Sequence, residues 1–202
     1  IVDVVRVPVT ADVEGGYGDV AETVRGIVDA GACGINLEDS AGDGPVLHAI
    51  AAQAARIAAA RRAADAAGAP IFVNARIDVY LKGVGAPDGR FDETVARAHA
   101  YVAAGADGVF VPGVVDAATI RALAQAIDAP LNVMAAQGAP DVGTLGKLGV
   151  ARVSLGPYVM LALMKRMRHD VAEILRTGRY DTVADRMTFA EADGLMPDTR
   201  GA

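Results

Sequence analysis

The 202-residue sequence contains no tryptophan, only 4% aromatic residues and a single cysteine, Cys33. One cysteine cannot form a disulfide within the chain, so we expect a reducing compartment. No apolar run approaches the roughly 18 residues that a membrane-spanning helix needs. The longest such run, at 159–164, is followed at once by Lys165 and Arg166. With no recognisable secretory signal, the sequence predicts a cytoplasmic protein without a membrane partner.

An excess of basic residues is also lacking. Lysine and arginine number 19 against 25 aspartate and glutamate residues, which gives a net charge of −6. This balance argues against a nucleic-acid partner, which would require a basic face. The length fits one domain, and 52% hydrophobic residues can form a substantial core. We therefore expect a single domain over 1–202.

Short apolar runs alternate with longer, alanine-rich segments of helical pattern. The expected strands are 7–12, 33–39, 71–76, 108–111, 131–135 and 150–155. The expected helices are 19–30, 46–67, 92–104, 116–127, 141–148 and 157–177, with further short helices after residue 180. This alternation is typical of βαβ units around a parallel sheet.

Two α/β folds fit six such units. A doubly wound sheet would usually carry a G-x-G-x-x-G loop after its first strand, but the segment 14–18, EGGYG, lacks that spacing. We therefore favour a (β/α)8 TIM-type barrel, which has eight units in about 250 residues. The chain starts at Ile1, directly before a strand. We expect the first two βα units to lie upstream, and 157–202 to be extra C-terminal helices.

Polar residues end the first three expected strands. Residues i and i+2 share one face of a strand, and the carboxyl ends of barrel strands form the active-site face. Each strand closes on such a pair: Thr10 and Asp12, Asn36 and Glu38, Asn74 and Arg76. A single charged end could simply mark where a strand reaches solvent. Three successive strands with the same pattern predict one polar pocket at the barrel mouth.

The charges in this pocket indicate a cation. Two converging carboxylates, Asp12 and Glu38, raise each other's pKa unless positive charge lies between them. Arg76 can balance one of them. Oxygen ligands favour Mg²⁺ or Mn²⁺ for the other, and Mg²⁺ needs only one or two carboxylates.

Several strings in this order resemble the isocitrate lyase/phosphoenolpyruvate mutase superfamily. They are TADVEGGYG at 10–18, GINLED at 34–39, VNAR at 73–76, DGVFVP at 107–112 and RVSLG at 152–156. The resemblance covers nearly the whole chain. It is specific for the superfamily and much less so for one activity within it.

The resemblance implies a (β/α)8 barrel whose eighth helix is often exchanged within a dimer or tetramer. For this chain it implies a homodimer or homotetramer in which 157–202 could be swapped. It also implies Mg²⁺ and a small carboxylic acid, a 2-oxo acid or close relative, as ligand. Asp12 matches the second aspartate of the family's metal motif, Glu38 its metal-site glutamate, and Arg76 its substrate-binding arginine.

The sequence departs from the family pattern at three places. Thr10 stands where the metal motif often has its first aspartate. The lyases' Lys-Lys-Cys-Gly-His loop is replaced by SAGDGP at 40–45, and Pro112 stands where the family carries a histidine or glutamate. The usual acid–base residues are thus absent from these positions. Cys33 is no substitute, since we expect it in the core at the far end of the barrel.

These observations predict a Mg²⁺-dependent carbon–carbon lyase. Its substrate would be a 2-oxo or 2-hydroxy di- or tricarboxylic acid that reacts through an enolate, with oxaloacetate decarboxylation ahead of isocitrate or methylisocitrate cleavage. The alternatives are a phosphonopyruvate mutase or hydrolase, and a barrel that binds a 2-oxo acid without catalysis. We assign catalysis to Arg76 and Tyr17. Substrate binding is assigned to Arg76, Asn74, Asn132, Gly15 and Gly16.

Overall fold

The computed structural model describes residues 1–195 and divides into two compact units, Ile1–Ser154 and a second that starts at Leu155. The first unit carries six strands: β1 (Thr10–Asp12), β2 (Gly34–Glu38), β3 (Phe72–Arg76), β4 (Gly108–Val111), β5 (Leu131–Met134) and β6 (Val150–Ser154). Its α-helices are α1 (Val20–Asp29), α2 (Ile50–Ala66), α3 (Arg90–Ala103), α4 (Ala117–Ala126) and α5 (Val142–Lys147), and short 3-10 helices lie at Val2–Val4 and Pro87–Gly89. All expected strands and helices of this unit are present.

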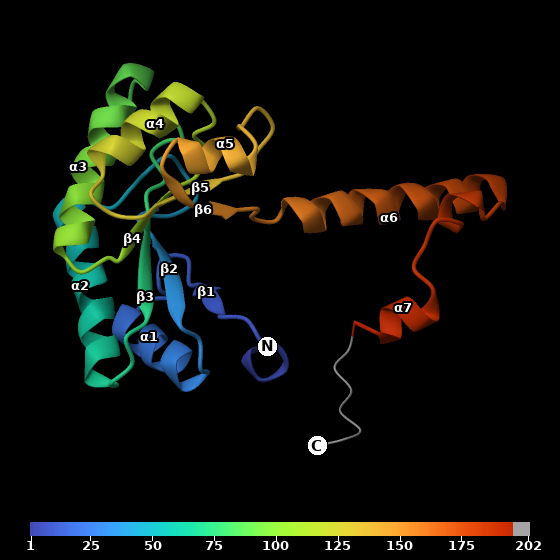
Figure 1. Cartoon of the computed structure of the whole chain (residues 1–202), viewed down its shortest axis with the longest axis horizontal. Coiled ribbons are helices and arrows are strands. Elements are labelled where there is room, and N and C mark those ends of the chain that lie inside the picture. The colour runs from blue at the N-terminus through green and yellow to red at the C-terminus, as the bar shows by residue number, and fades with distance from the viewer. Residues whose placement is uncertain (196–202) are drawn as a thin grey trace. The chain divides into compact units, whose positions relative to one another are not determined.

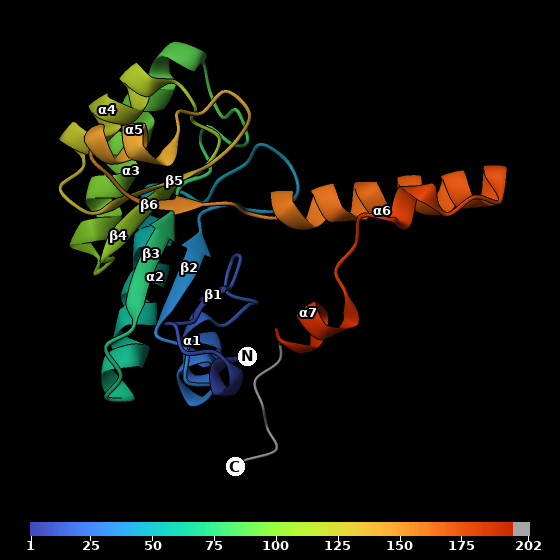
Figure 2. The ribbon, with the colours of Figure 1, turned by 45° about the vertical axis from the view of Figure 1, so that its right-hand side comes forward.

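The strands form one parallel sheet in the order β1-β2-β3-β4-β5-β6. Every neighbour in the sheet is thus the next strand along the chain, as in a barrel and unlike a doubly wound sheet. The sheet curls until its two edge strands face each other, and Arg152 of β6 donates a hydrogen bond to Thr10 of β1 at 3.1 Å. The first unit is a half-barrel of TIM type, with its helices on the outer face (Figures 1 and 2). Closure by two further units stays a prediction.

Three helices of the first unit begin at an aspartate cap. The carboxylates of Asp19, Asp116 and Asp141 accept hydrogen bonds from the first-turn N–H groups of α1, α4 and α5. Such a cap typically contributes about 1 kcal/mol. Gly105, with φ of +105°, ends the α3 turn in a conformation that other residues adopt only with strain.

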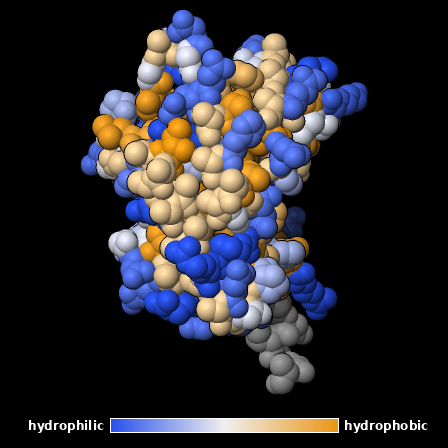
Figure 3. All heavy atoms as spheres, turned by 90° about the vertical axis from the view of Figure 1, so that its left-hand side faces the viewer, coloured by the Kyte–Doolittle hydropathy of each residue, from blue (hydrophilic) through white to orange (hydrophobic). Residues whose placement is uncertain are grey.

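The core lies between the sheet and its helices. On β2, Ile35 and Leu37 face the helices and are buried, while Asn36 and Glu38 alternate onto the inner face. Ile57 of α2 is fully buried against this sheet, and small residues such as Ala60 let the helix approach closely. The outer side formed by α2 and α3 faces the viewer in Figure 3, where hydrophilic and hydrophobic residues are interspersed.

Phe72, the first residue of β3, is 36% exposed and packs its ring against Gly108 of β4. A Cβ added at Gly108 would lie 2.8 Å from the Cζ of this ring. A Cβ at Gly34 would lie 2.9 Å from both the Phe72 carbonyl oxygen and a Thr10 methyl group. Gly108 therefore leaves space for the Phe72 ring, and Gly34 leaves space for the Phe72 main chain and the Thr10 methyl group.

The second unit contains α6 (Tyr158–Thr177), a 3-10 turn at Asp181–Val183 and α7 (Phe189–Asp193). The predicted helix at 157–177 is confirmed, and the short helices expected after residue 180 are present up to residue 195. Residues 196–202, which the prediction also included, lie outside the described residues. None of the described helices combines the length and apolar character needed to cross a membrane.

We predict that Gly108→Ala destabilises the first unit by roughly 1–3 kcal/mol, the usual cost of overpacking a core. Urea unfolding would measure this loss. Gly26→Ala is the control, because no atom lies within 4 Å of its added Cβ, and alanine favours a helix. In a Phe72→Leu background the cost of Gly108→Ala should shrink; an equal cost in both backgrounds would contradict the packing argument.

Candidate active site

The three strand ends meet as the sequence predicts. Glu38 and Arg76 are direct partners across β2 and β3, and Asp12 of β1 pairs with Asn36 of β2. The Arg76 Nη1 atom lies 2.9 Å from a Glu38 carboxylate oxygen and 3.8 Å from an Asp12 carboxylate oxygen. The side chain of Asp12 is 51% exposed, whereas those of Glu38 and Arg76 are 16% and 18% exposed. The site therefore combines one half-exposed carboxylate with one shielded carboxylate.

A third carboxylate, Asp78, completes the surroundings of Arg76 and was missed from the sequence. The Nε and Nη2 atoms of Arg76 donate to the two Asp78 carboxylate oxygens at 2.7 and 3.1 Å. The Ser40 hydroxyl donates to the same carboxylate at 2.5 Å, and Asp78 is fully buried. Extension of the i, i+2 pattern past Asn74 and Arg76 could have found it.

The charges around Arg76 shift its pKa and that of Glu38. Burial by itself would lower the pKa of Arg76, but its hydrogen bond to Asp78 and the three nearby carboxylates together raise it. Burial raises the pKa of Glu38, and Asp78 and Asp12 add to this, while Arg76 offsets it only in part. Arg76 thus stays charged, and Glu38 takes up a proton more readily than an ordinary glutamate.

The donor set fits a hard divalent cation. The carboxylates of Asp12 and Glu38 both lie near the Nη1 atom of Arg76, at 3.8 and 2.9 Å, so the two oxygen donors are close to each other. Within residues 1–195, no group of three or more His, Cys, Asp or Glu side chains is arranged to hold a metal ion. Asp12 and Glu38 would then be the protein ligands, with water for the remaining positions, a sparse coordination that Mg²⁺ accepts.

The inner face below these tips carries a layer of amides. Asn74 donates to Asn36 at 2.9 Å and to Asn132 at 3.2 Å, and Asn132 bonds to Ser154 of β6 at 3.1 Å. Asn74 and Asn132 are 1% and 2% exposed. Their predicted contact with substrate stays a prediction, and the structure gives them mutual hydrogen bonds that link β2, β3, β5 and β6.

The loop from β1 to α1 carries Gly15, Gly16 and Tyr17. Tyr17 is 68% exposed and has a positive φ of 45°. At Gly16, φ is +80° and an added Cβ would lie 2.7 Å from a Val20 methyl group. The Gly15 carbonyl oxygen accepts a hydrogen bond from Arg56 of α2. A main-chain carbonyl of the loop is thus bound by α2. The roles of Gly15, Gly16 and Tyr17 toward a substrate stay predictions.

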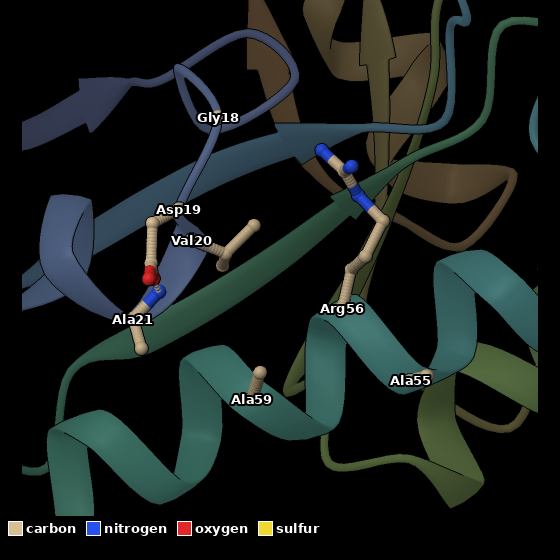
Figure 4. Close-up of a pocket in the computed structure, with 7 residues that line it drawn as sticks. All are labelled: Gly18, Asp19, Val20, Ala21, Ala55, Arg56 and Ala59. Atoms are coloured by element: carbon tan, nitrogen blue, oxygen red, sulfur yellow. Dashed lines mark hydrogen bonds between the residues drawn. The ribbon is translucent and has the colours of Figure 1, made fainter.

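A surface depression of about 330 Å³ adjoins this loop (Figure 4). It is lined by the start of α1 and one side of α2: Gly18, Asp19, Val20, Ala21, Ala55, Arg56 and Ala59. The Asp19 carboxylate already accepts the first N–H groups of α1 there, and none of Asp12, Glu38 and Arg76 lines it. The depression is separate from the charged site.

The loop after β2, residues 39–49, is tied down by contacts of its main chain. Ser40 and Leu47 form an antiparallel bridge, and Lys82 donates to the carbonyl oxygens of Gly42 and Gly44 at 2.7 and 3.2 Å. Residues 40–47 contain no cysteine, histidine or lysine. The prediction that Cys33 lies in the core is wrong. It is exposed, because it precedes β2 at the sheet's amino-terminal end, and its thiol donates to the Val9 carbonyl oxygen.

Comparison with known proteins identifies the family. The sequence model of the family described as phosphoenolpyruvate phosphomutase matches residues 1–175. The chain belongs to the isocitrate lyase/phosphoenolpyruvate mutase superfamily. The superfamily's TIM-type fold agrees with the half-barrel and the charged strand ends.

Individual relatives of this superfamily differ in activity. A solved structure of a candidate phosphonomutase from Burkholderia cenocepacia is 48% identical, with a TM-score of 0.78 over 84% of this chain and 72% of that chain. The 2-methylisocitrate lyase of Escherichia coli is 32% identical over 93% of this chain and 66% of its own length. An oxaloacetate decarboxylase of Bradyrhizobium is 30% identical over 85% of this chain and 60% of its own length. The chain therefore spans less than two thirds of these curated relatives.

We predict that the shifted pKa of Glu38 is visible in stability. Between the ordinary value of 4.5 and the raised folded pKa, the folded chain holds a proton that the unfolded chain has released. The free energy of unfolding should therefore fall as pH rises through this window, relative to Glu38→Gln, and the difference should become constant above it. Urea unfolding over a pH series would measure this.

Asp116 provides the control for this titration. Its hydrogen bonds to Thr119 lower its pKa, so its contribution should be present above the unfolded pKa and lost as pH falls through the folded one. The free energy of unfolding of the native chain, relative to that of Asp116→Asn, should therefore rise with pH, opposite to the change expected for Glu38. If the native chain instead becomes more stable relative to Glu38→Gln as pH rises through this window, the prediction is contradicted.

Proposed function

We propose that the protein is a Mg²⁺-dependent carbon–carbon lyase of small 2-oxo or 2-hydroxy di- or tricarboxylic acids. The observation that carries the proposal is the Arg76 guanidinium, anchored on one edge by Asp78 and directed by Nη1 toward Asp12 and Glu38. This places a fixed positive group beside two carboxylates suited to a cation. The 2-methylisocitrate lyase and oxaloacetate decarboxylase relatives support the same class of reaction.

The arrangement suits a reaction in which negative charge develops on an oxygen. In oxaloacetate the bond between C3 and the C4 carboxylate breaks, CO₂ leaves, and the electron pair moves through C3 to the 2-oxo oxygen. Mg²⁺, when bound at Asp12 and Glu38, supplies positive charge for that oxygen. Arg76 binds a substrate carboxylate and adds a preorganised donor. Protonation at C3, by Tyr17 or by water, then gives pyruvate.

Decarboxylation is favoured over retro-aldol cleavage by the loop after β2. Cleavage of a 2-hydroxy acid requires a base to remove the hydroxyl proton. The segment 40–47 supplies no cysteine, histidine or lysine, and its main chain is held by Lys82; the loop's one histidine, His48, follows this segment just before α2. Loss of CO₂ needs no such base, so the half of the chemistry that the site contains is sufficient for oxaloacetate.

The direct test is release of CO₂ from oxaloacetate with Mg²⁺. We expect turnover that EDTA abolishes, and a loss of about 10²–10³-fold in kcat for Asp12→Ala and for Arg76→Lys. Asp12→Ala removes a carboxylate that would hold the cation, and Arg76→Lys keeps the positive charge but loses the directed donors of the guanidinium. Asp107→Asn is the matched control. Asp107 directly precedes β4 and pairs with Arg61, so this variant also disturbs an arginine–aspartate pair, but one outside the charged site. Turnover that survives EDTA and Asp12→Ala would sink the proposal.

The alternative with specific support is phosphonopyruvate chemistry, because the 48% identical structure is of a candidate phosphonomutase. Incubation with phosphonopyruvate followed by ³¹P NMR decides between the two. Phosphoenolpyruvate or inorganic phosphate as product, with no CO₂ released from oxaloacetate, would favour the alternative. Calorimetric binding of oxaloacetate with no turnover of any of these acids would indicate a barrel that binds a 2-oxo acid without catalysis.

We also infer that the protein acts as a homodimer or homotetramer in the cytoplasm. The support is α6, a 20-residue helix with no buried residue. Its exposed side chains include Met160, Leu163, Met164 and Met167, an apolar series that suits helix packing between copies. Light scattering should give two or four times the 20.6 kDa chain mass, and Leu163→Lys with Met167→Lys should reduce it; a native monomer would refute the inference.

A further inference from the structure

We propose that Asp78 is a positioning residue that determines which edge of Arg76 a ligand meets. Arg76 has three nitrogens that can donate, and Asp78 engages Nε and Nη2. Only Nη1 is directed toward Asp12 and Glu38. The inference rests on the proposed function for its catalytic consequence, and on geometry alone for the orientation of the guanidinium.

Asp78 is suited to this task because it cannot move easily. Its side chain is fully buried and also accepts the Ser40 hydroxyl. Its backbone N–H donates to a carboxylate oxygen of Asp39 at 2.9 Å. Both its main chain and its side chain are therefore anchored, so the carboxylate presents a rigid two-oxygen edge to Arg76.

A buried cluster behind the site holds Asp39 in turn. Its second carboxylate oxygen accepts from Arg97 at 3.1 Å and from the Tyr101 hydroxyl at 3.0 Å, both on α3. Arg97 also donates to the His48 carbonyl oxygen and to Glu93. The side chains of Asp39 and Arg97 are 0% and 7% exposed. The chain of contacts runs from α3 through Asp39 and Asp78 to the guanidinium of Arg76.

A purely structural role for Asp78 would predict a different outcome from a positioning role. If Asp78 only stabilised the fold, Asp78→Asn would lower stability and leave Arg76 oriented as before in the folded chains. If it positions Arg76, the variant frees the Nε edge, because an asparagine carries no charge and one of its two terminal atoms donates instead of accepting.

The orientation is tested by NMR of the Arg76 side chain. We expect one Nε–H signal, absent from Arg76→Lys, that exchanges with water about tenfold or more faster in Asp78→Asn, because the variant loses a hydrogen bond to a charged group. Asp107→Asn is the matched control and should leave this signal unchanged. Equal exchange in native chain and Asp78→Asn would overturn the inference.

The catalytic consequence is tested by a double-mutant cycle on oxaloacetate turnover. Asp78→Asn should lower kcat/KM about 100-fold, the scale of a misplaced catalytic group, and should cost little more in an Arg76→Lys background because both changes act on one group. Asp107→Asn should change kcat/KM by the same factor in the native chain and in Arg76→Lys. Full additivity of Asp78→Asn and Arg76→Lys would overturn the positioning role.

The two arms separate this inference from the proposed function. An inactive native chain whose Arg76 signal still depends on Asp78 would refute the lyase and support the positioning of Arg76. An active native chain whose kcat/KM and Arg76 signal do not change in Asp78→Asn would refute the positioning and leave the lyase standing.

Discussion

The guanidinium of Arg76 is shared by three carboxylates, and the carboxyl ends of β1, β2 and β3 depend on it. Two of those carboxylates, Glu38 and Asp78, are largely or fully shielded from water. Removal of a charge partner from such a group leaves an uncompensated buried ion at a cost of several kcal/mol. The strand ends are therefore held together by the same group that would meet a substrate, so stability and function are coupled at one side chain.

Much of the fold was predictable from local pattern. The alternation of apolar runs with alanine-rich helices gave every strand of the half-barrel to within three residues at each end. The i, i+2 spacing placed Asp12, Glu38 and Arg76 on one face because side-chain direction in a strand depends only on alternation. These features need no information about distant contacts.

The rest depends on distant contacts. Asp39 and Asp78 follow the strand ends, where a sequence reader expects solvent, yet both are fully buried. Arg97 and Tyr101 of α3 cover Asp39 from 58 and 62 residues away in the chain, and Asp78 is contacted by Ser40, 38 residues before it. For Cys33 the error ran in the other direction: its predicted place at the far end of the barrel is correct, but the side chain is exposed there and does not lie in the core.

The tied loop after β2 has a consequence for the fate of a reactive carbanion. Enzymes that join two molecules must keep such a species dry until the second reactant arrives, usually beneath a closing segment. Here Lys82 fastens the turn to the chain beyond β3, and Asp12 stays half in contact with water. Solvent would quench the carbanion within the pocket. For the lyase proposed above, this arrangement would favour breaking molecules apart over condensation.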